Sequence, residues 1–178
     1  MSSTYEILLA GFGGQGILFA GKAISYSGMK SGCEVSWIPS YGPEMRGGTC
    51  NCSVVVSDEL IGCPIVTQPN ILIAMNGPSY EKFKNTVVTG GRVLVDSSLV
   101  TDKSERDDIT FTAVPATQLA TDNGYPKLAN MILVGKLLKD TGFVDYEDFK
   151  KSLSDIIPES KKALLETNLK AVDLGYNF

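Results

Sequence analysis

Short apolar runs alternate with stretches of helical periodicity along most of this chain. The runs are too short for helices and rich in Val, Ile and Leu, which is typical of strands buried on both faces of a sheet. The predicted strands are residues 7–10, 33–38, 52–56, 70–75, 92–96 and 109–114, and the predicted helices include 17–31, 80–85 and 127–140. This alternation predicts an α/β fold, a three-layer Rossmann-like domain with a largely parallel sheet covered by helices on both faces. No linker or repeat divides residues 1–178, so we expect a single domain.

A glycine-rich turn separates the first predicted strand from the first predicted helix. Gly11, Gly13 and Gly16 follow the G-x-G-x-x-G spacing, with Gly14 and Gln15 inside it. Glycines allow positive φ angles and let a ligand or a neighbouring chain approach the backbone closely. The N–H groups at the start of a helix favour an anion such as phosphate. We therefore predict that the turn binds a phosphate or a partner's backbone, with free N–H groups around residues 13–16 facing a cleft at the carboxyl ends of the strands.

The end of the second predicted strand bears on which cofactor the turn could serve. In a dinucleotide-binding unit, an Asp or Glu at that position accepts hydrogen bonds from the ribose. Here the strand ends in Trp37-Ile38-Pro39-Ser40, and Glu34 lies at its other end. A free-standing dinucleotide-binding oxidoreductase therefore stays an alternative that the glycine spacing favours and the missing acid disfavours.

Residues 39–49 form a loop too rich in Gly and Pro for the interior of a helix or strand. The loop contains Tyr41, Gly42, Glu44, Arg46 and Gly47. One interpretation is a solvated connector in which Glu44 pairs with Arg46, and the other is a functional loop held by a rigid scaffold. We expect Arg46 to bind an anion from outside the chain, because its planar fork matches a carboxylate or a phosphate.

After this loop, the sequence predicts a hairpin at an edge of the sheet. The β-branched run 52–56 is followed by a turn at Asp58-Glu59 and by a shorter run, 60–66, that contains Gly62 and Pro64. Proline is tolerated at sheet edges, so we expect the two runs to form an edge pair.

Composition narrows the chemistry that the chain can perform. It has no histidine, which excludes Ser-His-Asp and Cys-His catalysis and histidine metal sites within the chain. The four cysteines lack the C-x-x-C spacing of zinc and iron–sulfur sites, so we expect reduced structural thiols, with a metal site at Cys50 and Cys52 as the minor alternative. We assign no catalytic residue and no metal ligand.

Charge and hydropathy limit the classes of binding partner and the cellular location that we expect for the protein. A formal net charge of −4 disfavours a nucleic-acid binder, which usually has a basic face. No apolar run approaches the roughly 20 residues that span a bilayer, and the N-terminus lacks a basic leader segment. We therefore expect a cytoplasmic protein that binds neither nucleic acid nor a membrane.

Two motifs and the strand that follows them resemble, in this order, the gamma subunit of the 2-oxoacid:ferredoxin oxidoreductases. They are Gly11-Phe-Gly-Gly-Gln-Gly16, Ser40-Tyr-Gly-Pro-Glu-Met-Arg-Gly-Gly-Thr49 and Cys52-Ser-Val-Val-Val-Ser57. The resemblance covers nearly the whole chain and is most specific in residues 7–66. It implies a Rossmann-like domain of an enzyme that oxidatively decarboxylates a 2-oxoacid to an acyl-coenzyme A and CO2 and passes electrons to ferredoxin. The motif residues carried over are Gly11, Gly13, Gly14, Gln15 and Gly16 in the turn, and Tyr41, Gly42, Glu44, Arg46 and Gly47 in the loop.

The resemblance also implies partners and cofactors. The chain would pack against alpha and beta subunits and a ferredoxin-like delta subunit, and would serve ferredoxin through the complex. Thiamine diphosphate, Mg²⁺, iron–sulfur clusters and coenzyme A would belong to the whole complex, with none bound by this chain alone. The isolated chain is then expected to be inactive and able to form a homodimer through its exposed interface. Pyruvate, 2-oxoglutarate and branched-chain 2-oxoacids all stay open as substrates, and a pure assembly module, whose glycines only admit a neighbouring helix, is a further alternative.

Overall fold

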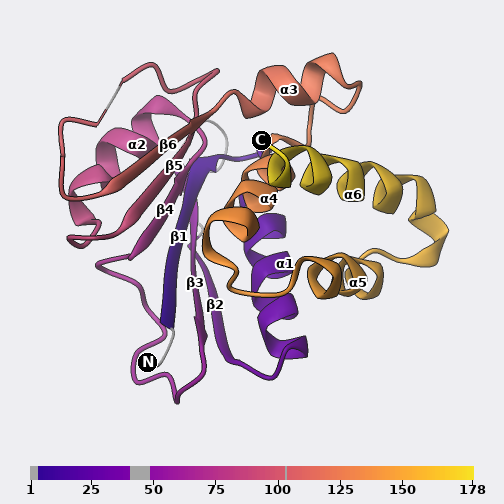
Figure 1. Ribbon diagram of the computed structural model, residues 1–178, viewed down its shortest axis with the longest axis horizontal. Helices are drawn as coiled ribbons and strands as arrows, with labels where there is room; N and C mark the ends of the chain where they lie inside the picture. The colour runs from indigo at the N-terminus through magenta and orange to yellow at the C-terminus, as the bar shows by residue number, and fades with distance from the viewer. Residues whose placement is uncertain (1–3, 41–48, 103) are drawn as a thin grey trace.

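The computed structural model describes residues 4–40, 49–102 and 104–178 (Figure 1). The strands are β1 (Thr4–Phe12), β2 (Glu34–Ser40), β3 (Thr49–Ser57), β4 (Ile71–Ala74), β5 (Arg92–Asp96) and β6 (Thr110–Val114). The helices are α1 (Ile17–Lys30), α2 (Gly77–Phe83), α3 (Ala116–Asp122), α4 (Ala129–Thr141), α5 (Tyr146–Ile156) and α6 (Lys162–Tyr176), with short 3₁₀ turns at Lys84–Thr86 and Glu159–Lys161. None of the helices in these ranges is both long and apolar enough to cross a membrane.

The strands form one sheet in the order β2-β3-β1-β4-β5-β6. Strands β1, β4, β5 and β6 run parallel to one another, whereas β3 runs antiparallel to both of its neighbours, β1 and β2. The predicted α/β fold with a mostly parallel sheet is therefore confirmed.

The predicted edge hairpin is wrong. Residues 60–66 form no strand, and β3 lies inside the sheet, while β2 forms the edge. Gly62 and Pro64 explain the first error, since glycine weakens a strand and proline removes a ladder donor. The burial of Val54, Val55 and Val56 on both faces of β3 explains its interior position.

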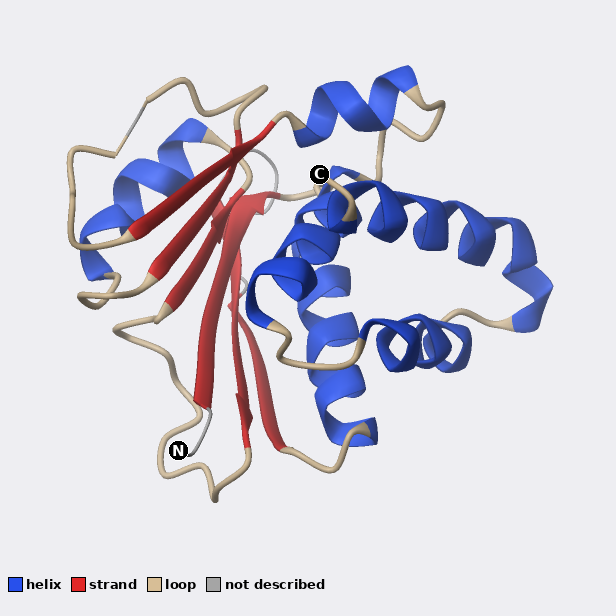
Figure 2. Cartoon of the chain, viewed as in Figure 1, coloured by secondary structure: helices blue, strands red, loops and turns tan. Residues whose placement is uncertain are grey.

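Helices cover the two faces of the sheet unequally (Figure 2). One face, with Ile7 and Leu9 of β1, belongs to a large core that includes side chains of α1, α4, α5 and α6. The opposite face, with Leu8 of β1, packs in a smaller core around Tyr80 of α2 and Val87. Alternate residues of β1 are therefore buried on opposite sides, which is why its sequence reads as an unbroken apolar run.

Helices α4 and α6 cross at a point where a glycine of each helix contacts the backbone of the other. A Cβ added at Gly175 would collide with the carbonyl oxygen of Ile132, and one added at Gly135 would collide with that of Val172. The helix axes can approach this closely only because neither position carries a side chain. This contact closes the outer part of the large core.

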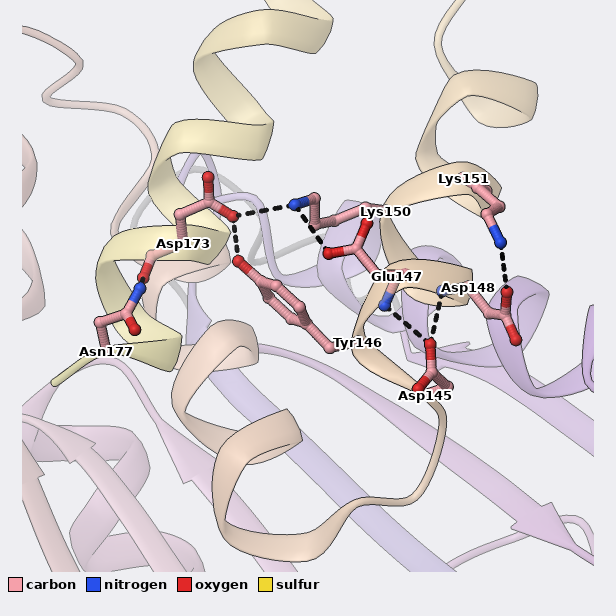
Figure 3. A network of polar contacts seen from close by, with 8 residues as sticks. All are labelled: Asp145, Tyr146, Glu147, Asp148, Lys150, Lys151, Asp173 and Asn177. Carbon is pink, nitrogen blue, oxygen red and sulfur yellow. Dashed lines mark hydrogen bonds and ion pairs between the residues drawn. The ribbon is translucent and has the colours of Figure 1, made fainter.

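A polar network joins α5 to α6 (Figure 3). Asp145 caps α5 and accepts a hydrogen bond from the N–H of Glu147 at 2.9 Å. The Tyr146 hydroxyl donates to Asp173 of α6, and Lys150 Nζ lies 3.6 Å from the same carboxylate. Burial, followed by the hydrogen bond to Asp173, raises the pKa of Tyr146, so the phenol stays protonated as a donor. The network has a structural role in orienting α5.

We predict that Gly175→Ala lowers the free energy of unfolding by about 1–3 kcal/mol, the usual cost of overpacking. Alanine is the better helix former by about 1 kcal/mol, so a destabilisation would show that the close crossing dominates. Urea denaturation measures the effect, with Gly62→Ala as the control because a Cβ there meets no atom within 4 Å. A more stable Gly175→Ala variant would contradict the prediction.

Candidate functional site

The glycine turn lies at the carboxyl edge of the sheet, where the parallel strands end. It joins β1, in the middle of the sheet, to α1, and Met75 N–H, just after β4, donates to Ala10 O at 2.9 Å. Ligands of open α/β sheets bind at this edge. The turn therefore occupies the part of the fold where a binding site is expected.

Two of the glycines of the turn allow close packing within the protein. A Cβ at Gly11 would lie 2.7 Å from Gln15 Oε1 and 2.8 Å from Ile17 Cδ1. Gly16 is the N-cap of α1, with a φ of 75°, and a Cβ there would lie 2.5 Å from Asn130 Nδ2. Both positions require glycine for reasons internal to the fold.

The side chain of Gln15 braces the turn from inside. Its Oε1 accepts hydrogen bonds from Phe12 N–H at 2.6 Å and from Asn76 Nδ2 at 3.0 Å, and its Nε2 donates to Met75 O at 3.0 Å. Asn76 is itself buried, and its Oδ1 accepts from Ser79 N–H, which caps α2. One amide thus connects the ends of β1 and β4 to the start of α2.

Gly13 and Gly14 form the exposed part of the turn. Within the part of the chain that the structure describes, their N–H groups have no acceptor, whereas Gln15 N–H bonds to Phe12 O at 3.2 Å. Gly14 has a φ of 95° but open space around it, so its requirement for glycine is conformational. The turn thus offers backbone donors to solvent at this edge, and what they bind stays a prediction.

Tyr41, Gly42, Glu44, Arg46 and Gly47 lie outside the described residues. The strands that flank them are described: Ser40 of β2 pairs with Asn51, and Thr49 of β3 pairs with Phe12. Both ends of segment 41–48 are therefore anchored at the edge that carries the glycine turn.

Asn130 of α4 is a contributor that the sequence analysis did not single out. Its Nδ2 donates to Gly16 O at 3.0 Å, which ties α4 to the N-terminus of α1. Its Oδ1 is buried and has no hydrogen-bond partner among the described residues. An unpaired buried acceptor costs about 1–3 kcal/mol, so this oxygen is a local source of instability beside the turn. The sequence signal that could have identified Asn130 is a polar residue at the start of an otherwise apolar helix.

The side chains around the turn provide little acid–base chemistry. Asp96, at the end of β5, is fully buried and accepts hydrogen bonds from Thr117 N–H at 3.2 Å and Ser98 N–H at 3.1 Å. Cys50 pairs with Gly11 across the strands, and burial raises the pKa of its thiol. Burial also raises the pKa of Cys52 to about 12, so both thiols are protonated at neutral pH. Within the described ranges, no three His, Cys, Asp or Glu side chains are grouped to hold a metal ion.

A comparison with protein families matches residues 6–178 to the pyruvate ferredoxin/flavodoxin oxidoreductase family. The 2-oxoglutarate synthase subunit KorC of Methanocaldococcus jannaschii is 39% identical over 174 residues, covering 96% of this chain and 91% of the relative. The ketoisovalerate oxidoreductase subunit VorA of Methanothermobacter marburgensis is 37% identical over 172 residues, but this chain spans 35% of its length.

Two solved structures share the fold. The gamma subunit of a keto/oxoacid ferredoxin oxidoreductase from Geobacter sulfurreducens has a TM-score of 0.83 and 31% identity, and the match covers 97% of this chain and 96% of that one. A 2-oxoglutarate:ferredoxin oxidoreductase chain from Magnetococcus marinus has a TM-score of 0.87 and 26% identity; the match covers 98% of this chain and 30% of that one. That structure is described with 2-oxoglutarate, coenzyme A and succinyl-CoA bound.

We predict that Gln15→Ala lowers the free energy of unfolding by about 1–3 kcal/mol, because it removes three hydrogen bonds worth about 0.5–1.5 kcal/mol each and water can replace some of them. Chemical denaturation measures this loss. The matched control is Gln118→Ala, an exposed glutamine that donates to Asp122 at 2.7 Å, and it should change stability by less than about 0.5 kcal/mol. Equal stability of the two variants would show that Gln15 does not brace the turn.

Proposed function

The chain belongs to the pyruvate ferredoxin/flavodoxin oxidoreductase family, and from this premise we propose that it is the gamma subunit of a 2-oxoacid:ferredoxin oxidoreductase. The complex would decarboxylate a 2-oxoacid, release an acyl-coenzyme A and CO2, and pass the electrons to ferredoxin. The observation that carries the proposal is the match, over nearly the full length of both chains, to the Geobacter gamma subunit and to KorC.

Within that complex, we propose that this chain supports the active site rather than performing the chemistry. The free N–H groups of Gly13 and Gly14 would bind a phosphate, such as that of coenzyme A, or a partner's backbone. Segment 41–48 would lie beside them, with Arg46 on an anion. The coenzyme A in the Magnetococcus structure supports a role near this ligand.

The other cofactors would be bound by partner chains. The four cysteines lack the C-x-x-C spacing that is typical of iron–sulfur ligation. Thiamine diphosphate, Mg²⁺ and the clusters would therefore lie on the alpha, beta and delta-type subunits, and ferredoxin would dock on the complex. We further propose that residues 1–178 form one domain and that the complex is cytoplasmic.

The free-standing dinucleotide-binding alternative has less support. Strand β2 ends at Ile38-Pro39-Ser40, and this end carries no Asp or Glu to accept hydrogen bonds from a ribose.

Purification of the tagged chain from its native host tests the proposal. We expect it to be recovered with thiamine-binding and cluster-bearing chains, in a complex that reduces ferredoxin when a 2-oxoacid and coenzyme A are added. Recovery of the chain alone, or of a complex without this activity, would overturn it.

The proposed role of Arg46 predicts that Arg46→Lys slows turnover of the reconstituted complex. Lysine keeps the charge but loses the two parallel hydrogen bonds, so the expected loss is about 1.5–3 kcal/mol in kcat/KM, the value of hydrogen bonds to a charged group. Arg92→Lys is the matched control, because Arg92 begins β5 and so lies at the edge of the sheet opposite the glycine turn. Unchanged turnover in an intact Arg46→Lys complex would favour the solvated Glu44–Arg46 pair.

A further inference from the structure

We propose that segment 58–68 and the half of the sheet beneath it form a docking face for the larger partner chain of the complex. The docking face comprises residues 58–68 together with Ile38 of β2 and Ser53 of β3, on the side of the sheet opposite α1. This inference rests on the proposed function, because it names the surface through which the subunit would join its partner.

The first observation is that the fold leaves this half of the sheet without a helix. Helix α2 contacts β1 and β4, whereas the described chain places only the irregular segment 58–70 along the same side of β2 and β3 (Figure 2). Long segments without regular structure are uncommon inside compact domains and are often functional. The layer on this side is therefore incomplete.

The second observation is the exposure of apolar side chains on that segment. Leu60 is 88% exposed and Ile65 is 58% exposed. Between residues 60 and 68, the one hydrogen bond to the sheet within the described ranges runs from Ser36 Oγ to Pro64 O at 3.4 Å. The segment is held by the buried side chain of Val66 and by few hydrogen bonds, and two exposed large apolar side chains on it are typical of an interaction surface.

The third observation is that the segment packs loosely on the sheet. A groove of about 490 Å³ runs beside it, lined by residues that include Ile38, Ser53, Ile65 and Phe83. A second hollow of about 130 Å³ lies beneath its first part, bordered by Glu6 and Leu60. Protein interiors are close-packed, so these hollows mark a face that the described residues do not fill with their side chains.

The relatives indicate what kind of molecule fills it. KorC has nearly the length of this chain, whereas the unit is about a third of VorA and of the Magnetococcus chain. In the longer relatives, the matching unit is joined to further polypeptide within one chain. A separate subunit such as this one would use its docking face to bind, without a covalent link, a partner chain that corresponds to the rest of the longer relatives.

The charges at the rim favour such a partner over a second copy of this chain. Glu34 and Glu59 are both exposed next to Ser57, and neither forms an ion pair among the described residues. A symmetric dimer whose two-fold axis passes near Ser57 would bring the acidic side chains of both copies together. The expected partner surface is therefore apolar and flanked by Lys or Arg.

The groove also connects the docking face to the candidate functional site. Ser40 and Asn51 line its end at the carboxyl edge, and Ser40 directly precedes segment 41–48. A partner seated in the groove would thus lie next to the carboxyl edge of the sheet, on which the glycine turn also lies.

The test compares Leu60→Lys with Met29→Lys in binding to the complex depleted of this subunit. Met29 is 49% exposed on α1, which covers the other side of the sheet. Like Leu60 it is a large exposed apolar residue, but it lies outside the docking face. We expect Leu60→Lys to weaken binding by about tenfold or more, as an interface anchor does, and Met29→Lys to bind like the wild type. Thermal unfolding confirms that both variants are folded.

Hydrogen exchange of the wild-type chain provides a second measurement. The amides of residues 60–68 should exchange rapidly in the isolated chain and slow at least tenfold in the complex. Wild-type binding by Leu60→Lys, or unchanged exchange, would overturn the docking face and leave the proposed function intact. Loss of a homodimer with normal complex formation would assign the face to a second copy and also overturn it. Failure of the wild type to bind the depleted complex would overturn the proposed function instead.

Discussion

The pairing of β1 along both of its edges is the constraint on which the rest of the structure depends. It pairs with β3 from Thr4 to Phe12 in the antiparallel direction, and with β4 from Ile7 to Ala10 in the parallel direction. Both faces of β1 are buried, so a shift of one residue would exchange the side chains that fill the two cores, Ile7 and Leu9 on one face and Leu8 on the other. The glycine turn at the end of β1 is thereby fixed at the carboxyl edge of the sheet. It lies there with the end of β4, the end of β2 and the start of β3.

Within the glycine motif, structural and exposed positions alternate. Gly11 and Gly16 make room for side chains of the fold, and Gln15 turns inward to hold Met75 and Asn76. Between these contacts, Gly13 and Gly14 are exposed, and their N–H groups have no acceptor among the described residues. The G-x-G-x-x-G pattern alone therefore indicates a tight strand-to-helix turn, while the availability of its donors depends on residues far away in the sequence.

The sequence predicted those features that short-range patterns determine. Strand β5 has its predicted bounds, and α4 lies within a residue or two of its expected range, because apolar periodicity and flanking glycines define both. The edge hairpin was wrong because the choice of partner for β3 depends on long-range pairing. Asn130 was missed for the same reason: its hydrogen bond reaches Gly16, 114 residues away. The ligand of the turn stays a prediction, since it depends on atoms outside the described chain.

Helices cover one side of the sheet more completely than the other, and this difference favours the less covered side for the binding of another chain. On the α1 side, helices α1, α4, α5 and α6 contribute to the large core, and α4 and α6 meet at backbone distance through Gly135 and Gly175. On the opposite side, irregular chain and hollows lie over β2 and β3. The open side and the carboxyl edge meet at Ser40 and Asn51. A partner that covers the groove would lie next to the carboxyl edge, so the proposed docking face and the candidate functional site are neighbours on one surface.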